Sequence, residues 1–199
     1  MKILNLYAGI GGNRRLWGDE HEITAVEYDY HIANVYAGLY PNDNLIVDDA
    51  HEYLLEHFKE FDFIWSSPPC PSHSRVRKIN AKAKPVYPDM RLYEEILLLK
   101  HYYNGQWVVE NVKPFYEYLI KPDRVVGRHP YWTNIQFDEI EVIKNRIGAK
   151  RGENAHLAAI HEIDVNALKM VDTRRVLRNM VDPKVGLHIL QHAQNPAQS

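Results

Sequence analysis

The chain has 199 residues, of which 45% are hydrophobic, and its 24 basic and 26 acidic residues give a formal net charge of −2. This length suits one compact domain with a small appendage. The near balance of charge gives no global electrostatic reason to bind nucleic acid, although a local basic patch is compatible with it. The sequence has no run of about 18 apolar residues, and its first residues resemble a strand rather than a signal peptide. We therefore expect no membrane span and a cytoplasmic location.

The chain contains a single cysteine, Cys70. One cysteine excludes an internal disulfide and any zinc site built from several thiolates. A lone cysteine is most often a small buried hydrophobe, so its neighbours have to decide whether it is reactive.

The first half of the chain alternates short apolar strands with amphipathic helices. We expect strands at 3–7, 23–27, 45–47, 61–66 and 106–110, and helices at about 13–18, 31–39, 51–58 and 90–103. Strands separated by helices pair in parallel through right-handed crossovers. The pattern therefore predicts an α/β fold with a doubly wound, mostly parallel sheet, in which ligands bind beyond the carboxyl ends of the strands.

From about residue 124 the pattern changes. Further strands are expected at 125–132 and 137–143, whereas 144–154 are polar and without clear periodicity. Helical character is expected at 164–169 and 173–177, followed by a closing helix at 183–192 and a frayed tail.

Three consecutive strand ends carry residues suited to an adenosine-containing cofactor. The glycine-rich turn at 7–12 lets the backbone approach a ligand, and the helix after it begins with free N–H groups. Glu27 ends the second strand and is placed to accept hydrogen bonds from ribose hydroxyls. Asp49 ends the third strand and is placed to accept a hydrogen bond from an adenine amino group. Each acid alone would fit a solvated loop or a helix cap equally well, and Asp49 is a good N-cap candidate.

Cys70 lies in the segment Ser-Ser-Pro-Pro-Cys-Pro-Ser-His-Ser, residues 66–74, directly after the fourth strand. Two prolines restrict the backbone before the thiol, and a nucleophilic thiolate needs nearby positive charge or a helix N-terminus. Residues 75–84 contain five basic side chains and no acid: Arg75, Arg77, Lys78, Lys82 and Lys84. Such a segment can be a plain solvated loop, but beside the cysteine we favour a mobile loop that binds phosphates.

Glu110 ends the fifth strand, in the apolar run Val-Val-Glu-Asn-Val at 108–112. It is either a surface residue at a strand end or a carboxyl group whose pKa is raised by desolvation, so that it can donate a proton to a bound ring. The sequence leaves both interpretations open.

Three of these segments resemble, in order and spacing, the motifs of the cytosine-5 DNA methyltransferase family. They are Asn-Leu-Tyr-Ala-Gly-Ile-Gly-Gly at 5–12, Pro-Pro-Cys at 68–70 with Ser74, and Glu-Asn-Val at 110–112. Shorter islands resemble the family's later arginine-bearing strand at 127–134, its closing Gly-Asn-x-Val-x-Pro motif at 178–183, and an Asp-x-Arg element at 89–91. Arg178 departs from the glycine of the closing motif.

This resemblance implies a Rossmann-like sheet of the S-adenosylmethionine-dependent methyltransferase type and a reaction that needs no metal. In that reaction the Cys70 thiolate adds to carbon 6 of a flipped-out cytosine in double-stranded DNA. Glu110 protonates ring nitrogen 3, Arg128 stabilises the developing charge, and S-adenosylmethionine methylates carbon 5.

The resemblance also assigns binding roles to individual residues. The residues expected to bind the cofactor are Tyr7, Ala8, Gly9, Ile10, Gly11, Gly12, Glu27, Tyr28, Asp49, Ala50, Pro69 and Asn179. The residues expected to contact nucleic acid are Ser74, Arg75, Arg77, Lys78, Lys82 and Arg91.

Family members usually carry a long target-recognition region, which is reduced here. We expect a catalytic and cofactor-binding domain at 1–135, a reduced target-recognition region at 136–175, a closing helix at 176–192 that returns to the catalytic domain, and a tail at 193–199. Phosphate contacts are expected from Arg146, Lys150, Arg151, Arg174 and Arg175. Such compact members look like those of phages and mobile elements, with a short recognition sequence, relaxed specificity or a helper protein.

Three alternatives remain open. A tRNA-methylating branch shares the same motifs, and the motifs also allow transfer of a different group from an altered cofactor. The third alternative is an inactive methyltransferase-like protein that binds DNA or regulates an active enzyme, although the joint presence of Cys70 and Glu110 argues against it.

Overall fold

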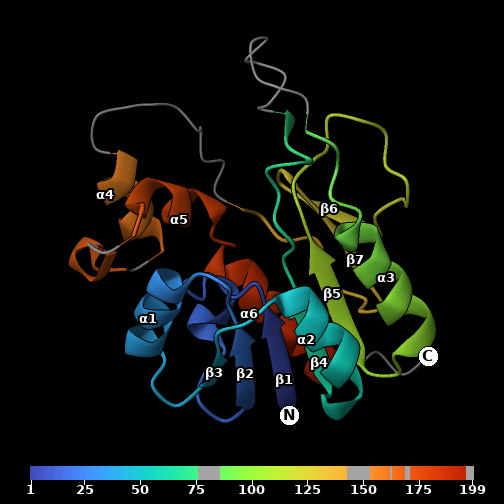
Figure 1. The fold of residues 1–199 in the computed structure, drawn as a ribbon, viewed down its shortest axis with the longest axis horizontal. Helices are drawn as coiled ribbons and strands as arrows, with labels where there is room; N and C mark the ends of the chain where they lie inside the picture. The colour runs from blue at the N-terminus through green and yellow to red at the C-terminus, as the bar shows by residue number, and fades with distance from the viewer. Residues whose placement is uncertain (76–85, 143–152, 162, 169–170, 196–199) are drawn as a thin grey trace.

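A central β-sheet organises the computed structural model, which describes residues 1–75, 86–142, 153–161, 163–168 and 171–195. Within these residues the sheet has seven strands in the order β3-β2-β1-β4-β5-β7-β6 (Figure 1). Five strands are parallel: β1 (Lys2–Leu6), β2 (Glu22–Val26), β3 (Asn44–Ile46), β4 (Phe63–Ser66) and β5 (Gln106–Glu110). β7 (His129–Thr133) is antiparallel to both β5 and β6 (Arg124–Val126). The predicted mostly parallel α/β sheet is therefore confirmed.

Helices cover both faces of this sheet. The α-helices are α1 (Tyr30–Leu39), α2 (Ala50–His57), α3 (Arg91–Tyr102), α4 (Glu153–Ile160), α5 (Thr173–Asn179) and α6 (Pro183–Gln194). Short 3₁₀ helices are found at η1 (Asn13–Leu16), η2 (Phe58–Glu60) and η4 (Val165–Leu168). α2 and α3 lie in front of the sheet in Figure 1, and α6 lies behind it. The carboxyl ends of the parallel strands face the side of the molecule that carries α4 and α5.

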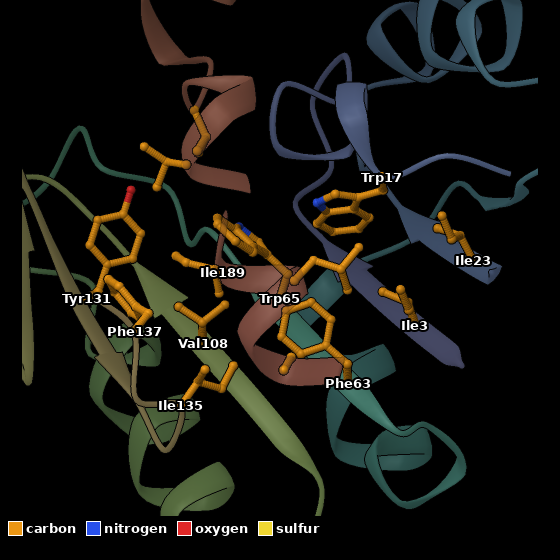
Figure 2. Packing of buried hydrophobic residues seen from close by; sticks show 14 residues of the cluster. Ile3, Trp17, Ile23, Phe63, Trp65, Val108, Tyr131, Ile135, Phe137 and Ile189 are labelled. Atoms are coloured by element: carbon orange, nitrogen blue, oxygen red, sulfur yellow. The ribbon is translucent and has the colours of Figure 1, made fainter. Parts of the chain in front are cut away.

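The two faces of the sheet bury alternate residues of each strand, as the period of a strand requires. Phe63 and Trp65 of β4 pack against Trp17 and Ile189 on the α6 face (Figure 2), whereas Ile64 packs with α2 and α3 on the other face. Strands that are buried on both faces are almost continuously apolar, which is the pattern of the central strands here.

Two elements of the second half differ from the predicted ones. The strand predicted at 137–143 is wrong for residues 137–142, which have no regular structure. Both edges of β7 are already paired, with β5 and β6, so this segment covers the core with side chains instead of joining the ladder: Phe137 is buried, and Ile140 and Val142 pack beside it. α4, which the sequence analysis did not predict, follows the polar stretch.

Among the described residues, no helix is long and apolar enough to cross a membrane.

Candidate active site

The glycine-rich turn after β1 is folded tightly against its neighbours. Tyr7, Gly9 and Gly11 have positive φ angles of 54°, 57° and 75°, and a Cβ on Gly11 would lie 2.3 Å from the Tyr40 ring. A Cβ on Gly12 would lie 2.8 Å from a backbone oxygen of the segment between α5 and α6. Gly9 differs, because no atom lies within 4 Å of the position of its Cβ. The turn is therefore closely packed on one side and open at Gly9, as the approach of a ligand to the backbone requires.

Glu27 lies directly beside this opening. Its carboxyl group accepts hydrogen bonds from the backbone N–H of Gly9 at 2.9 Å and of Asp29 at 2.9 Å. Burial raises the pKa of Glu27, although these backbone hydrogen bonds lower it. The next residue, Tyr28, leaves 77% of its surface exposed. The structure thus brings together three of the residues predicted to bind the cofactor, from the segments that directly follow β1 and β2.

Asp49 is the N-cap residue of α2. This is the structural role that the sequence also allowed for it. Its Oδ1 accepts hydrogen bonds from the backbone N–H of His51 at 2.9 Å and of Glu52 at 3.4 Å. Its Oδ2 pairs with Arg91 at 2.9 Å. Burial raises the pKa of Asp49, but the Arg91 guanidinium and the backbone donors outweigh it and hold this pKa below its usual range. Arg91, predicted to contact nucleic acid, therefore contacts a predicted cofactor residue.

Glu95 of α3 lies beneath this site and was missed by the sequence analysis. Its side chain is fully buried (0% exposed) and accepts hydrogen bonds from Tyr7 Oη at 2.6 Å, His51 Nδ1 at 3.1 Å and Ser66 Oγ at 2.5 Å. A signal was present, because Glu95 follows Leu92 by three residues and therefore lies on the apolar face of its helix. A buried carboxyl group requires partners, and here they come from the ends of β1 and β4 and from α2.

The loop that carries Cys70 is anchored to the end of β5. Asn111 Nδ2 donates to the carbonyl oxygen of Pro68 at 2.9 Å, and the Cys70 carbonyl accepts from the backbone N–H of His73 at 3.0 Å and of Ser74 at 3.1 Å. Arg75 Nε donates to the carbonyl of Pro114 at 2.9 Å. The Pro-Pro-Cys and Glu-Asn-Val segments, 40 residues apart in sequence, thus form one unit.

Glu110 and Arg128 act electrostatically on the Cys70 thiol, which is half-buried. Burial raises the pKa of Cys70, the Glu110 carboxyl group raises it further, and the Arg128 guanidinium lowers it. Glu110 is buried at the end of β5, and Arg128 is exposed in the turn between β6 and β7. The three predicted catalytic residues therefore lie in one site. Glu110 also contacts His129, a further residue that the sequence analysis did not select.

Four further residues were predicted to bind the cofactor. Ile10 and Ala50 are buried, whereas Pro69 and Asn179 are exposed. Asn179 ends α5 and precedes Met180 and Val181, which pack against Gly12. In place of the family's glycine, Arg178 forms an ion pair with Glu153 at 2.7 Å.

Several predicted phosphate contacts have acidic partners or fall in segments that are not described. Arg174 pairs with Glu153 at 3.2 Å, and Arg175 pairs with Asp29 at 3.5 Å. The predictions for Arg77, Lys78, Lys82, Arg146, Lys150 and Arg151 lie outside the described residues.

The strand order, the antiparallel β7 beside β5, and the glycine turn and acids at the first strand ends define a Rossmann-like fold of the S-adenosylmethionine-dependent methyltransferase class. A model of the family of C-5 cytosine-specific DNA methylases matches residues 1–117. Because this match covers more than half of the 199 residues, the chain belongs to the C-5 cytosine-specific DNA methylase family. Membership of this family implies S-adenosylmethionine as the methyl donor.

No curated protein matches the chain significantly. Among solved structures, a mutant of DNMT2 from Spodoptera frugiperda is similar at 30% identity and a TM-score of 0.41, with 57% of this chain and 36% of that chain covered. A DNA modification methyltransferase encoded within a prophage (E. coli) is similar at 20% identity and a TM-score of 0.39, with coverage of 59% and 33%. The chain thus spans about a third of the length of these structures.

Proposed function

We propose that this protein transfers a methyl group from S-adenosylmethionine to carbon 5 of cytosine in double-stranded DNA, with Cys70 as a covalent nucleophile. The observation that carries the proposal is the joining of the Cys70 loop to the end of β5 by the Asn111–Pro68 hydrogen bond. This contact supports a site in which a thiol, a buried carboxyl group and a guanidinium act on the same ring. Such a combination is suited to nucleophilic addition with proton transfer and charge stabilisation.

In this proposal the target cytosine leaves the base stack, because the ring is inaccessible to the thiol inside a duplex. The Cys70 sulfur forms a bond to carbon 6, and Glu110 holds the amino edge and delivers a proton to nitrogen 3. Arg128 stabilises the charge that develops on the ring. After methylation, loss of the proton from carbon 5 and elimination of the Cys70 sulfur restore the aromatic ring and the free enzyme.

The cofactor residues proposed at the strand ends fit an adenosine-containing group. Gly9 leaves the space that a ligand needs, and Glu27 provides carboxylate oxygens beside it. When bound there, S-adenosylmethionine supplies an electrophilic methyl group. Tyr7, Gly11 and Gly12 shape the turn, and Tyr28 offers an exposed ring beside the opening.

The proposal is tested by transfer of labelled methyl groups from S-adenosylmethionine to duplex DNA and, in parallel, to tRNA. We expect label in DNA as 5-methylcytosine and its loss to background in Cys70→Ala, with cofactor binding by calorimetry retained in both proteins. Transfer by Cys70→Ala at the wild-type rate would contradict the covalent mechanism. Label in tRNA alone would assign an RNA substrate, and cofactor binding without any transfer would favour a regulatory protein or an altered cofactor.

A further inference from the structure

His129 lies between two of the proposed catalytic side chains. It is the first residue of β7, and only 15% of its side chain is exposed. Its Nδ1 contacts Oε1 of Glu110, from β5. Its Nε2 accepts a hydrogen bond from Nε of Arg128 at 3.1 Å. One imidazole ring therefore joins a carboxyl group and a guanidinium that are 18 residues apart in sequence.

Backbone pairing fixes the place of this ring. β7 is antiparallel to β5, with Glu110 opposite Tyr131. Beyond the strand, the N–H of Asn111 donates to the carbonyl of Pro130 at 3.2 Å, and the N–H of Lys113 donates to the carbonyl of Arg128 at 3.3 Å. The turn that carries Arg128 is thus held against the segment that carries Glu110, and His129 fills the space between the two side chains.

The hydrogen bonds determine which ring nitrogen carries the proton. An arginine Nε–H can only donate, so Nε2 of His129 has to be the acceptor. A neutral imidazole has one N–H, which must then be on Nδ1, where it donates to Glu110. If Nε2 carried a proton, it and the Nε–H of Arg128 would both be donors, and the hydrogen bond between them would be lost.

We propose that His129 is a positioning residue of the cytosine site, which holds Glu110 by Oε1 and Arg128 by Nε at the same time. The inference rests on the proposed function. With Oε1 bound, proton transfer to the base is confined to Oε2. As the bond between the Cys70 sulfur and carbon 6 forms and the ring π electrons shift toward nitrogen 3, the proton of the Glu110 acid form moves from Oε2 to nitrogen 3. The resulting carboxylate keeps the Nδ1–H hydrogen bond.

This arrangement acts through preorganisation. Free glutamate and arginine side chains sample many rotamers, and a displacement of about 1 Å in a catalytic group can cost on the order of 100-fold in rate. A second anchor supports the same geometry, because Nη2 of Arg128 donates to the carbonyl of Arg178 at 3.0 Å. The Arg128 guanidinium is thereby held from two sides, by β7 and by the end of α5.

The first test measures kcat and KM for methyl transfer to DNA in three variants of His129. His129→Ala removes both contacts, and we expect kcat to fall about 10- to 100-fold with KM for S-adenosylmethionine unchanged. His129→Asn keeps a donor near Nδ1 and should recover part of the loss, whereas His129→Gln keeps an acceptor near Nε2 and should recover less. His101→Asn, which changes an exposed histidine in the last turn of α3, should have no effect. Thermal unfolding of each variant separates loss of positioning from loss of the fold.

The second test needs no turnover. Nitrogen-15 NMR of the histidine-labelled wild type, with His129→Asn used for assignment, should show the Nδ1–H tautomer of His129 at neutral pH. An Nε2–H tautomer, wild-type kcat in His129→Ala, or a rise in KM for S-adenosylmethionine in place of the fall in kcat would each overturn the inference while leaving the proposed function intact. Wild-type protein that transfers no methyl group would overturn both.

Discussion

The two halves of the site are built in different ways. In the half of the site proposed to bind the cofactor, the buried Glu95 accepts hydrogen bonds from residues at the ends of β1 and β4 and in α2. On the catalytic side, Cys70 is half-buried and Arg128 is exposed. The proposed cofactor half is therefore held by a buried polar network, whereas the thiol and the guanidinium of the proposed catalytic half are accessible to solvent.

A second buried anchor supports the cofactor half. Arg14 pairs with Asp43 through two hydrogen bonds, at 2.9 and 3.0 Å, and Tyr36 donates to the same carboxylate at 2.7 Å. The Arg14 guanidinium lies 4.9 Å from the centre of the Tyr40 ring, and the Tyr40 hydroxyl donates to the carbonyl of Gly11 at 2.9 Å. The glycine turn is therefore fixed from below by polar contacts as well as by close packing.

The largest effect should come from removing the centre of the Glu95 network. Glu95→Ala leaves Tyr7, His51 and Ser66 without this acceptor, and breaking such a buried polar arrangement costs about 3–5 kcal/mol of unfolding free energy. The matched control is Glu94→Ala, because Glu94 also faces His51, at 3.4 Å, but its side chain is 61% exposed; we expect a change of about 0–1 kcal/mol. Urea unfolding measures both, and equal losses in the two variants would show that the buried hydrogen bonds of Glu95 do not stabilise the proposed cofactor half.

An intermediate effect is expected on the reactivity of Cys70. Burial and the Glu110 carboxyl group raise the pKa of the thiol, so alkylation by iodoacetamide should reach half of its maximal rate above the ordinary thiol pKa. Glu110→Gln removes a negative charge and should lower that midpoint, whereas Arg128→Gln removes a positive charge and should raise it. Because the chain has one cysteine, mass spectrometry follows the reaction directly. Shifts of both variants in the same direction would show that these two charges do not face the thiol.

The smallest effect should be a pH dependence of stability that originates at His51. The hydrogen bond to Glu95 raises the pKa of His51, although burial opposes it. A raised pKa in the folded state means that this contribution is complete below the unfolded value of about 6.5 and is lost as the pH rises through the folded pKa. One proton limits the slope to about 1.4 kcal/mol per pH unit. Unfolding between about pH 5.5 and 9 should show this slope in the wild type and lose it in His51→Gln; an unchanged slope would assign it to another group.

The amino-acid sequence by itself determined the fold class and which candidate site residues lie at the ends of strands. Alternating strands and helices predicted the parallel sheet, and the residues at the ends of the strands predicted where Gly9, Glu27 and Cys70 would lie. These features are visible in sequence because a strand, its turn and the following helix involve residues within a few positions of one another. The strand predicted at 137–142 shows the limit of this approach, since the apolar residues there fit a strand but pack against the core instead of pairing with the sheet.

Only the tertiary structure decided which side chains meet. Tyr7 and Glu95 are 88 residues apart, and Asp49 and Arg91 are 42 residues apart, so neither contact follows from local periodicity. The pairing of Glu110 with His129 likewise depends on the register of β7 against β5. These contacts matter for stability because a buried polar group that has lost its water costs free energy unless it has a hydrogen-bond partner. The tertiary structure determines which residue lies close enough to be that partner.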